Sequence, residues 1–325
     1  MSVGSLIIVF SLVALPLRAE ELPRRCIPRL AERVRGALTG PVWTCWPNGR
    51  WKSATVLLDG RRNGRERRWS AAGRLLSRRD YRLGLLHGEA LELYDSGTKS
   101  HRVGYRFGRK HGTETLWSRA GRRVLQREYV NGRLHAEEWE WYESGAKKSL
   151  RTWFQGRRHG ISRGWSPSGV KIREGRFRLG RRDGRWTFWH PNGRIAQQGS
   201  YDNGLFTGFW TQWHPNGRVR WRVFYLHGRR LGPRTLYDAA GRRLLDETYD
   251  HGRLHGSYTR WHPNGQLAYK GSYDQGAKNG QQLEFYADGT RKSEEHYFHG
   301  ERCGSTKRWD HTGRLISELR APRCP

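Results

Sequence analysis

The sequence is poor in acidic residues, in apolar residues and in cysteine. It holds 30 Asp and Glu against 61 Lys and Arg, which gives a formal net charge of +31. Only 35% of the residues are hydrophobic, a low fraction for a globular enzyme of this length. The 12% of aromatic residues argue against a disordered chain, because disordered segments are poor in rings. Abundant rings together with 41 glycines favour many short strands joined by tight turns.

No apolar stretch after Leu17 is long enough to cross a membrane. Residues 3–17 are uncharged and apolar, and Ala19 follows as a small residue, as in a signal peptide with its cleavage site. We therefore expect a signal peptide over residues 1–19 and an exported protein, either periplasmic or secreted. No transmembrane span is expected in the mature chain.

The four cysteines lie in two pairs at opposite ends of the chain. Cys26 and Cys45 are near the start, and Cys303 and Cys324 are near the end. In an exported chain an even number of cysteines indicates disulfides, and we expect Cys26–Cys45 and Cys303–Cys324 to close short loops. Four free thiols are the alternative. No C-x-x-C spacing supports a zinc site.

Glycine recurs at a constant spacing of twenty-four positions, without insertion or deletion. A second glycine stands eleven positions after the first, from Gly60 to Gly300, and a third stands four positions later, from Gly64 to Gly304, with Ala136 as the one exception. The repeat is therefore established by the sequence alone. The first glycines are Gly49, Gly73, Gly97, Gly121, Gly145, Gly169, Gly193, Gly217, Gly241, Gly265, Gly289 and Gly313.

Two columns of rings share this period. One lies eight positions after the first glycine, mostly Tyr, and the other lies twenty positions after it, mostly Trp. Since the columns are half a period apart, each repeat is expected to form two strands and two turns. Turns such as Pro215-Asn216-Gly217 are strong hairpin signals. We expect both ring columns to form one ladder on one sheet face, in a ribbon on the order of 110 Å long.

The segment GSYDNGLFTGFWTQWHPNG at residues 199–217 resembles the MORN-repeat variant family, whose bacterial members are often described as antitoxin-like. The resemblance covers about residues 46–316. It implies an all-β fold, an elongated single-layer antiparallel sheet of consecutive β-hairpins that forms an open, solenoid-like ribbon. We divide the chain into residues 1–19, a cap over 20–45, about eleven repeats over 46–316, and a tail over 317–325 that carries the last cysteine.

No pattern in the sequence predicts catalysis, a cofactor or a metal. Ser162 lies in a G-x-S-x-G match, but that motif needs a strand-to-helix turn, and no helical pattern follows here. Histidines recur at two repeat positions, where adjacent members would be about 10 Å apart, too far to share one zinc ion. We interpret these histidines as turn-flanking residues and expect a protein that is not an enzyme.

Arginine is the strongest functional signal, because it follows the first glycine in seven repeats and the second glycine in seven. Periodic guanidinium groups along the two long edges of a ribbon would suit a polyanion. The alternative interpretation is that arginine is abundant because of codon bias and serves only to keep the protein soluble. The candidate anion-binding residues are Arg50, Arg74, Arg122, Arg194, Arg218 and Arg242 after the first glycine, and Arg61, Arg109, Arg133, Arg157, Arg181, Arg229 and Arg253 after the second.

The predicted function is therefore non-enzymatic presentation of an extended basic, aromatic-lined surface to a protein or to an anionic partner. In an exported protein the anionic partner would be an envelope polysaccharide or lipid headgroups, and nucleic acid is less expected. The alternative, from the family resemblance, is an antitoxin-like protein that neutralises a toxin by direct binding.

Overall fold

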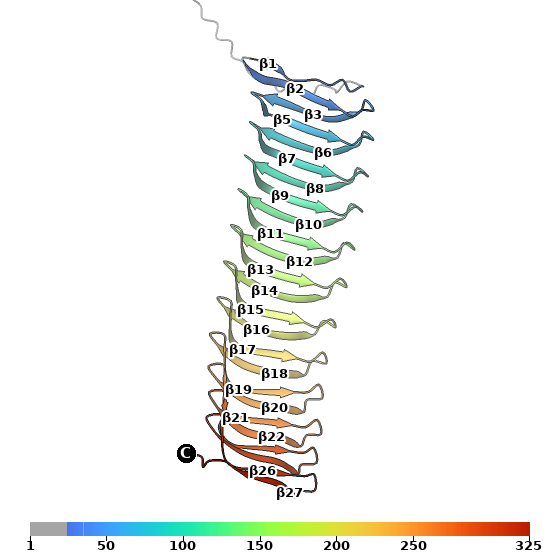
Figure 1. Ribbon diagram of the computed structural model, residues 1–325. Coiled ribbons are helices and arrows are strands. Elements are labelled where there is room, and N and C mark those ends of the chain that lie inside the picture. The colour runs from blue at the N-terminus through green and yellow to red at the C-terminus, as the bar shows by residue number, and fades with distance from the viewer. Residues whose placement is uncertain (1–24, 35) are drawn as a thin grey trace, which may run out of the picture.

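The chain forms one open antiparallel sheet of consecutive hairpins (Figure 1). The structure is a computed structural model that describes residues 25–34 and 36–325, so the expected signal peptide lies outside the described residues. All regular elements in this range are strands, and β1 and β27 lie at opposite ends of the ribbon. The predicted fold class is confirmed.

The strands have these bounds: β1 Glu32–Val34, β2 Ala37–Cys45, β3 Trp51–Leu58, β4 Arg61–Arg62, β5 Gly64–Trp69, β6 Leu75–Arg82, β7 Leu85–Leu93, β8 Lys99–Arg106, β9 Arg109–Trp117, β10 Arg123–Val130, β11 Arg133–Trp141, β12 Lys147–Phe154, β13 Arg157–Trp165, β14 Lys171–Arg178, β15 Arg181–Trp189, β16 Ile195–Asp202, β17 Leu205–Trp213, β18 Val219–Leu226, β19 Arg229–Tyr237, β20 Arg243–Asp250, β21 Arg253–Trp261, β22 Leu267–Asp274, β23 Ala277–Lys278, β24 Gly280–Phe285, β25 Arg291–Phe298, β26 Glu301–Trp309 and β27 Leu315–Arg320.

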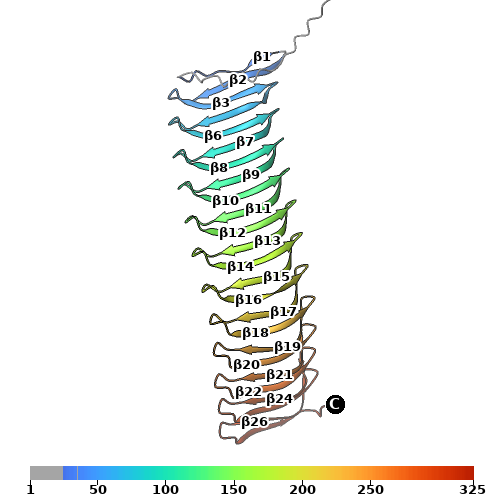
Figure 2. The same ribbon diagram turned by 180° about the vertical axis from the view of Figure 1, so that it is seen from behind.

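Turns follow one another along both long edges of the ribbon (Figures 1 and 2). We call them the first-glycine edge and the second-glycine edge, after the glycine that each turn contains. The turn at Gly193 is closed by hydrogen bonds from His190 N to Arg194 O and from Gly193 N to His190 O. At the second-glycine turn, Leu179 and Gly180 both have positive φ, as a two-residue type I′ hairpin turn requires.

The two ring columns lie on opposite faces of the sheet, which corrects the single ladder expected from the sequence. Tyr201 packs edge-on against Trp186 (6.0 Å between ring centroids), and Trp141 stacks on Trp139 (6.2 Å). Trp186 and Trp139 occupy adjacent positions of the repeat, and adjacent residues of a strand point to opposite faces. We therefore distinguish a tyrosine face, which carries Trp186, from a tryptophan face, which carries Trp139. A shift in strand register in every repeat, such as the one between Phe188 and Trp189, makes a simple count of residues misleading.

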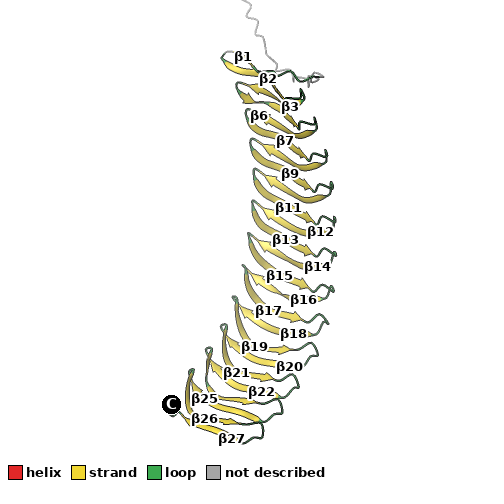
Figure 3. Ribbon diagram, turned by 45° about the vertical axis from the view of Figure 1, so that its right-hand side comes forward, coloured by secondary structure: helices red, strands yellow, loops and turns green. Residues whose placement is uncertain are grey.

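A central row of buried side chains runs along the tyrosine face. The residues seventeen positions after the first glycine include Glu114, Glu138, Ser162, Trp186 and Trp210, and each is at most 4% exposed. Such burial on a single layer comes from the neighbouring strands and from the rings and long side chains beside the row. The sheet bends along its length toward the β27 end (Figure 3).

Each of two side chains in this row is matched in size to the residue eleven positions before it. Trp210 lies over Gly199, where an added Cβ would meet the indole at 2.1 Å. In another repeat the sizes are reversed: the small Ser162 occupies the position of Trp210, and the large Arg151 occupies the position of Gly199. In these two repeats a large side chain in one position is thus accommodated by a small residue in the other.

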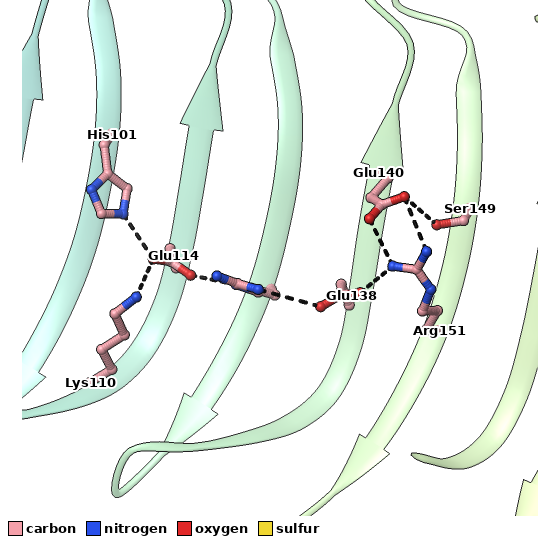
Figure 4. Close-up of polar contacts among 8 residues, drawn as sticks. His101, Lys110, Glu114, Glu138, Glu140, Ser149 and Arg151 are labelled. Atoms are coloured by element: carbon pink, nitrogen blue, oxygen red, sulfur yellow. Dashed lines mark hydrogen bonds and ion pairs between the residues drawn. The ribbon is translucent and has the colours of Figure 1, made fainter. Parts of the chain in front are cut away.

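Glu114 anchors a buried ionic network in the first half of this row (Figure 4). Its carboxylate bonds to His101 Nε2 (2.9 Å), Lys110 Nζ (2.6 Å) and Arg127 Nε, and Arg127 lies 3.8 Å from Glu138. Burial opposes ionisation of Glu114, but these hydrogen bonds together outweigh it and hold the pKa of its carboxyl well below the ordinary value. The network therefore stabilises the ionised form.

Both expected disulfides are present. Cys26 joins Cys45 at the β2 end, and Cys303 joins Cys324 at the β27 end. The ends of a repeat array lack one neighbour and need such reinforcement. Among the described residues, no helix is long and apolar enough to span a membrane.

Candidate anion-binding edge

The arginines that follow the first glycine are tied to the next repeat. Arg74 Nη1 donates to the Asp95 carbonyl (2.7 Å), and Arg122 Nη1 donates to the Glu143 carbonyl (3.0 Å). A similar bond, to the carbonyl one position further along the turn, joins Arg50 to Ala72, Arg194 to Asn216 and Arg218 to Ala240, whereas Arg242 pairs with Asp238 in its own turn. These arginines therefore have an internal structural role.

Two further side chains of the first-glycine turn reach the next repeat. Asn216 Nδ2 donates to the Ala239 carbonyl (2.7 Å), and its Oδ1 accepts from the Arg218 amide. His214 Nε2 donates to the Tyr237 carbonyl (2.9 Å). The Pro-Asn-Gly turns and the histidines before them thus connect repeats, a role that the sequence predicted only as turn flanking.

The arginines that follow the second glycine have no such partners. Each is exposed, and none forms a side-chain hydrogen bond or an ion pair with another described residue. The stem of Arg109 packs beside Gly132 of the next turn, and Arg133 packs beside Gly156 in the same way. Four members of this row, Arg109, Arg133, Arg157 and Arg181, occupy consecutive repeats. Because neighbouring repeats are two strands apart, these four span roughly 30 Å.

Like charges meet across two of these turns. Arg106 pairs with Arg109 across one hairpin, and Arg178 pairs with Arg181 across another. Like charges directly opposite each other in a sheet are destabilising. A bound anion would relieve this repulsion, which makes the second-glycine edge the more suitable of the two edges for an anionic ligand.

Exposed apolar side chains lie at the tips of the same turns. Leu83, Phe107 and Leu179 directly precede the second glycine and are more than half exposed. Each has a φ between 47° and 49°, a conformation that is uncommon for residues without a short polar side chain. The sequence contained this signal, an apolar residue directly before a turn glycine, but its exposure is evident only from the structure.

The G-x-S-x-G match of the sequence lies within a strand. Ser162 lies within β13, is 3% exposed and is not at a strand-to-helix turn. No group of three or more His, Cys, Asp or Glu that could hold a metal occurs in the part of the chain that the structure describes.

Comparisons with known proteins identify part of the array. A family model described as the MORN repeat variant matches residues 182–203, 254–275 and 278–299. No curated protein matches the chain. The chain is also similar to solved structures that include the crystal structure of TcdB2-TccC3-Cdc42 (11% identity, TM-score 0.18) and the Photorhabdus luminescens Tc holotoxin pore (12% identity, TM-score 0.17).

Each similarity covers 87% of this chain but only 18% of the other chain. The chain thus spans less than a fifth of the length of these structures, and TM-scores this low carry no argument about fold or function. The three MORN-variant segments indicate a repeat protein that binds other molecules.

Proposed function

We propose that this protein is an exported, non-catalytic scaffold that binds an extended anionic polymer along its second-glycine edge. The contrast between the two arginine rows supports the proposal most directly. On the first-glycine edge most guanidinium groups donate to backbone carbonyls, whereas on the second-glycine edge they have no partner among the described residues. Exposed, regularly spaced guanidinium groups suit phosphate, sulfate or carboxylate groups along a chain.

Two structural disulfides support the export part of the proposal. Such bonds persist mainly in oxidising compartments outside the cytoplasm. An acidic envelope polysaccharide is the class of partner that fits an exported ribbon with a linear row of positive charge. No feature of the fold or of the comparisons bears on the alternative of toxin neutralisation.

A binding assay with inorganic polyphosphate, a linear polyanion without sugar or lipid, tests this proposal. The test variant carries Arg109→Gln, Arg133→Gln, Arg157→Gln and Arg181→Gln. The control variant carries Arg50→Gln, Arg74→Gln, Arg122→Gln and Arg194→Gln, which removes the same charge from the other edge. Both variants are first checked for native far-UV circular dichroism at the assay temperature.

We expect the test variant to bind more weakly than the control and with a weaker dependence on salt. The slope of log affinity against log salt should fall by about three, since each neutralised phosphate contributes roughly 0.7–0.9. The control should keep most of its affinity. Equal losses in the two variants would mean that net charge, and no particular edge, governs binding.

A lipid surface is a second candidate, favoured by the exposed apolar residues on the same edge. Leu83, Phe107 and Leu179 would enter the headgroup region while the arginines contact anionic headgroups. Sedimentation with anionic and with neutral phosphatidylcholine vesicles distinguishes the two candidates. Binding to anionic vesicles that is lost on Phe107→Ser and Leu179→Asn, with polyphosphate binding unchanged, would favour the lipid surface.

A further inference from the structure

The last strand of the array leaves a core position uncovered. Leu319 in β27 occupies the repeat position that Val103 and Val223 occupy in the interior. The two valines are 1% exposed because a strand lies on each side of them, whereas Leu319 is 61% exposed and pairs only with Thr306. Ile316 in β27 is also 61% exposed. An exposed apolar strand edge is a template for pairing with another chain.

The opposite end of the array is covered. The short, charged β1 pairs with the beginning of β2, and the backbone of Arg29 bonds to that of Trp43 further along the same strand. The Cys26–Cys45 disulfide fixes this segment. Short edge strands with charged side chains oppose further pairing. The two ends of the ribbon are therefore not equivalent.

The tail after β27 does not cover the outer side of that strand. Ala321 N donates to the Gly304 carbonyl and Gly304 N donates to the Pro322 carbonyl, both at 2.7 Å. Together with the Cys303–Cys324 disulfide, these bonds hold the tail alongside β26. The outer edge of β27 has no strand partner among the described residues.

We propose that two copies of this chain pair end to end through β27, antiparallel and centred on Leu319. This register places Leu319 opposite the partner's Leu319, which covers the open core position of both copies. It also places Glu318 opposite the partner's Arg320, and by symmetry this favourable charge pair forms twice. The sequence of the edge is thus complementary to itself in this register.

The pairing has two structural consequences. Its two-fold symmetry closes the assembly at a dimer, and the covered β2 end prevents extension into a fibre. Because one short strand from each copy forms the interface, the dimer should dissociate on dilution. The dimer would be a rod of about twice the length of one chain, with both arginine edges free.

Sedimentation equilibrium and small-angle X-ray scattering of the full, oxidised chain test the proposal. We expect a monomer–dimer equilibrium in which the maximum dimension of the dimer is nearly twice that of the monomer. Leu319→Lys should weaken the dimer by at least about tenfold through lost contact and charge repulsion. Leu205→Lys, at a similarly exposed leucine on the second-glycine edge, is the control and should leave the dimer intact.

Charge exchange provides the decisive comparison. Glu318→Arg and Arg320→Glu should each weaken the dimer, because like charges then face each other twice. The double variant should restore it, since the opposite charges face each other again. A monomer at every concentration, failure of the double variant to restore pairing, or growth into long filaments would each overturn the proposal.

Discussion

Replacing Gly199 with alanine should destabilise the middle of the array, against the usual direction of this substitution. Gly199 lies in β16 with ordinary strand geometry, and a glycine-to-alanine change at such a site normally stabilises by about 0.4–1 kcal/mol through the unfolded chain. Here the new Cβ would lie 2.1 Å from Trp210 Cδ2. The sign of the effect therefore reports directly on the packing.

Trp210 cannot easily move away. It is 1% exposed, its Nε1 donates to the Ser200 carbonyl (2.9 Å), and its ring packs edge-on against Tyr201 and Phe206 at 5.0 and 4.7 Å. Forcing an extra methyl group into such a site typically costs about 1–3 kcal/mol. We expect a net loss of this size in the free energy of unfolding.

Gly164→Ala is the matched control. The three atoms nearest to an added Cβ there all belong to the side chain of Arg173, at 2.9–3.4 Å, and that side chain is exposed and can turn away. Urea unfolding followed by tryptophan fluorescence gives both free energies. Hydrogen exchange should place the loss in β16–β18, because a repeat array is stabilised by contacts between neighbours.

A second comparison isolates the contact with Trp210. In a Trp210→Leu background, Gly199→Ala should cost less than in the wild type, with a coupling of about 0.5–3 kcal/mol. If Gly199→Ala is no more destabilising than Gly164→Ala, the size matching inferred for the central row is refuted.

Two further predictions concern the ionic network and the β27 end. The lowered pKa of Glu114 means that its ionised form contributes stability above the ordinary glutamate pKa of about 4.3, and that this contribution is lost as the pH falls toward the folded-state pKa. Thermal unfolding from pH 6 to pH 2 should therefore show a steeper loss of stability in the wild type than in Glu114→Gln; parallel profiles would contradict this. Replacing Cys303 and Cys324 by serine opens a loop with a sequence separation of 21, which should cost about 3 kcal/mol, and hydrogen exchange should increase in β25–β27 only. An equal increase around Trp186 would show that the array unfolds as one unit.

The sequence was sufficient to predict the hairpin array, because turn chemistry is local. Glycine and Asn-Gly at fixed spacing specify where each strand ends, and the constant period of the repeat specifies the order of strands. The disulfide pairing followed from the position of the cysteines at the two ends. The faces of the two ring columns could not be predicted by counting, because one-residue register shifts such as the one between Phe188 and Trp189 are set by tertiary pairing.

The sequence also could not separate the two arginine rows, and backbone hydrogen bonding explains why. At the second-glycine edge each turn is joined to the preceding repeat by a backbone bond, as from Gly180 N to the Arg158 carbonyl, and in some repeats by an Asn or His side chain as well, as from Leu83 N to Asn63 Oδ1. At the first-glycine edge, carbonyls such as those of Asp95 and Glu143 accept from arginine side chains of the preceding repeat.

These bonds join neighbouring repeats, so arginine at the first-glycine edge contributes to the stability of the array. At the second-glycine edge the backbone already provides the bond between repeats, and the fold does not require arginine there. Seven arginines that stability does not explain, two of them facing another arginine across the turn, are the charges best placed to act on a partner. The same residue type in the same periodic pattern thus has a structural role on one edge and is available for binding on the other.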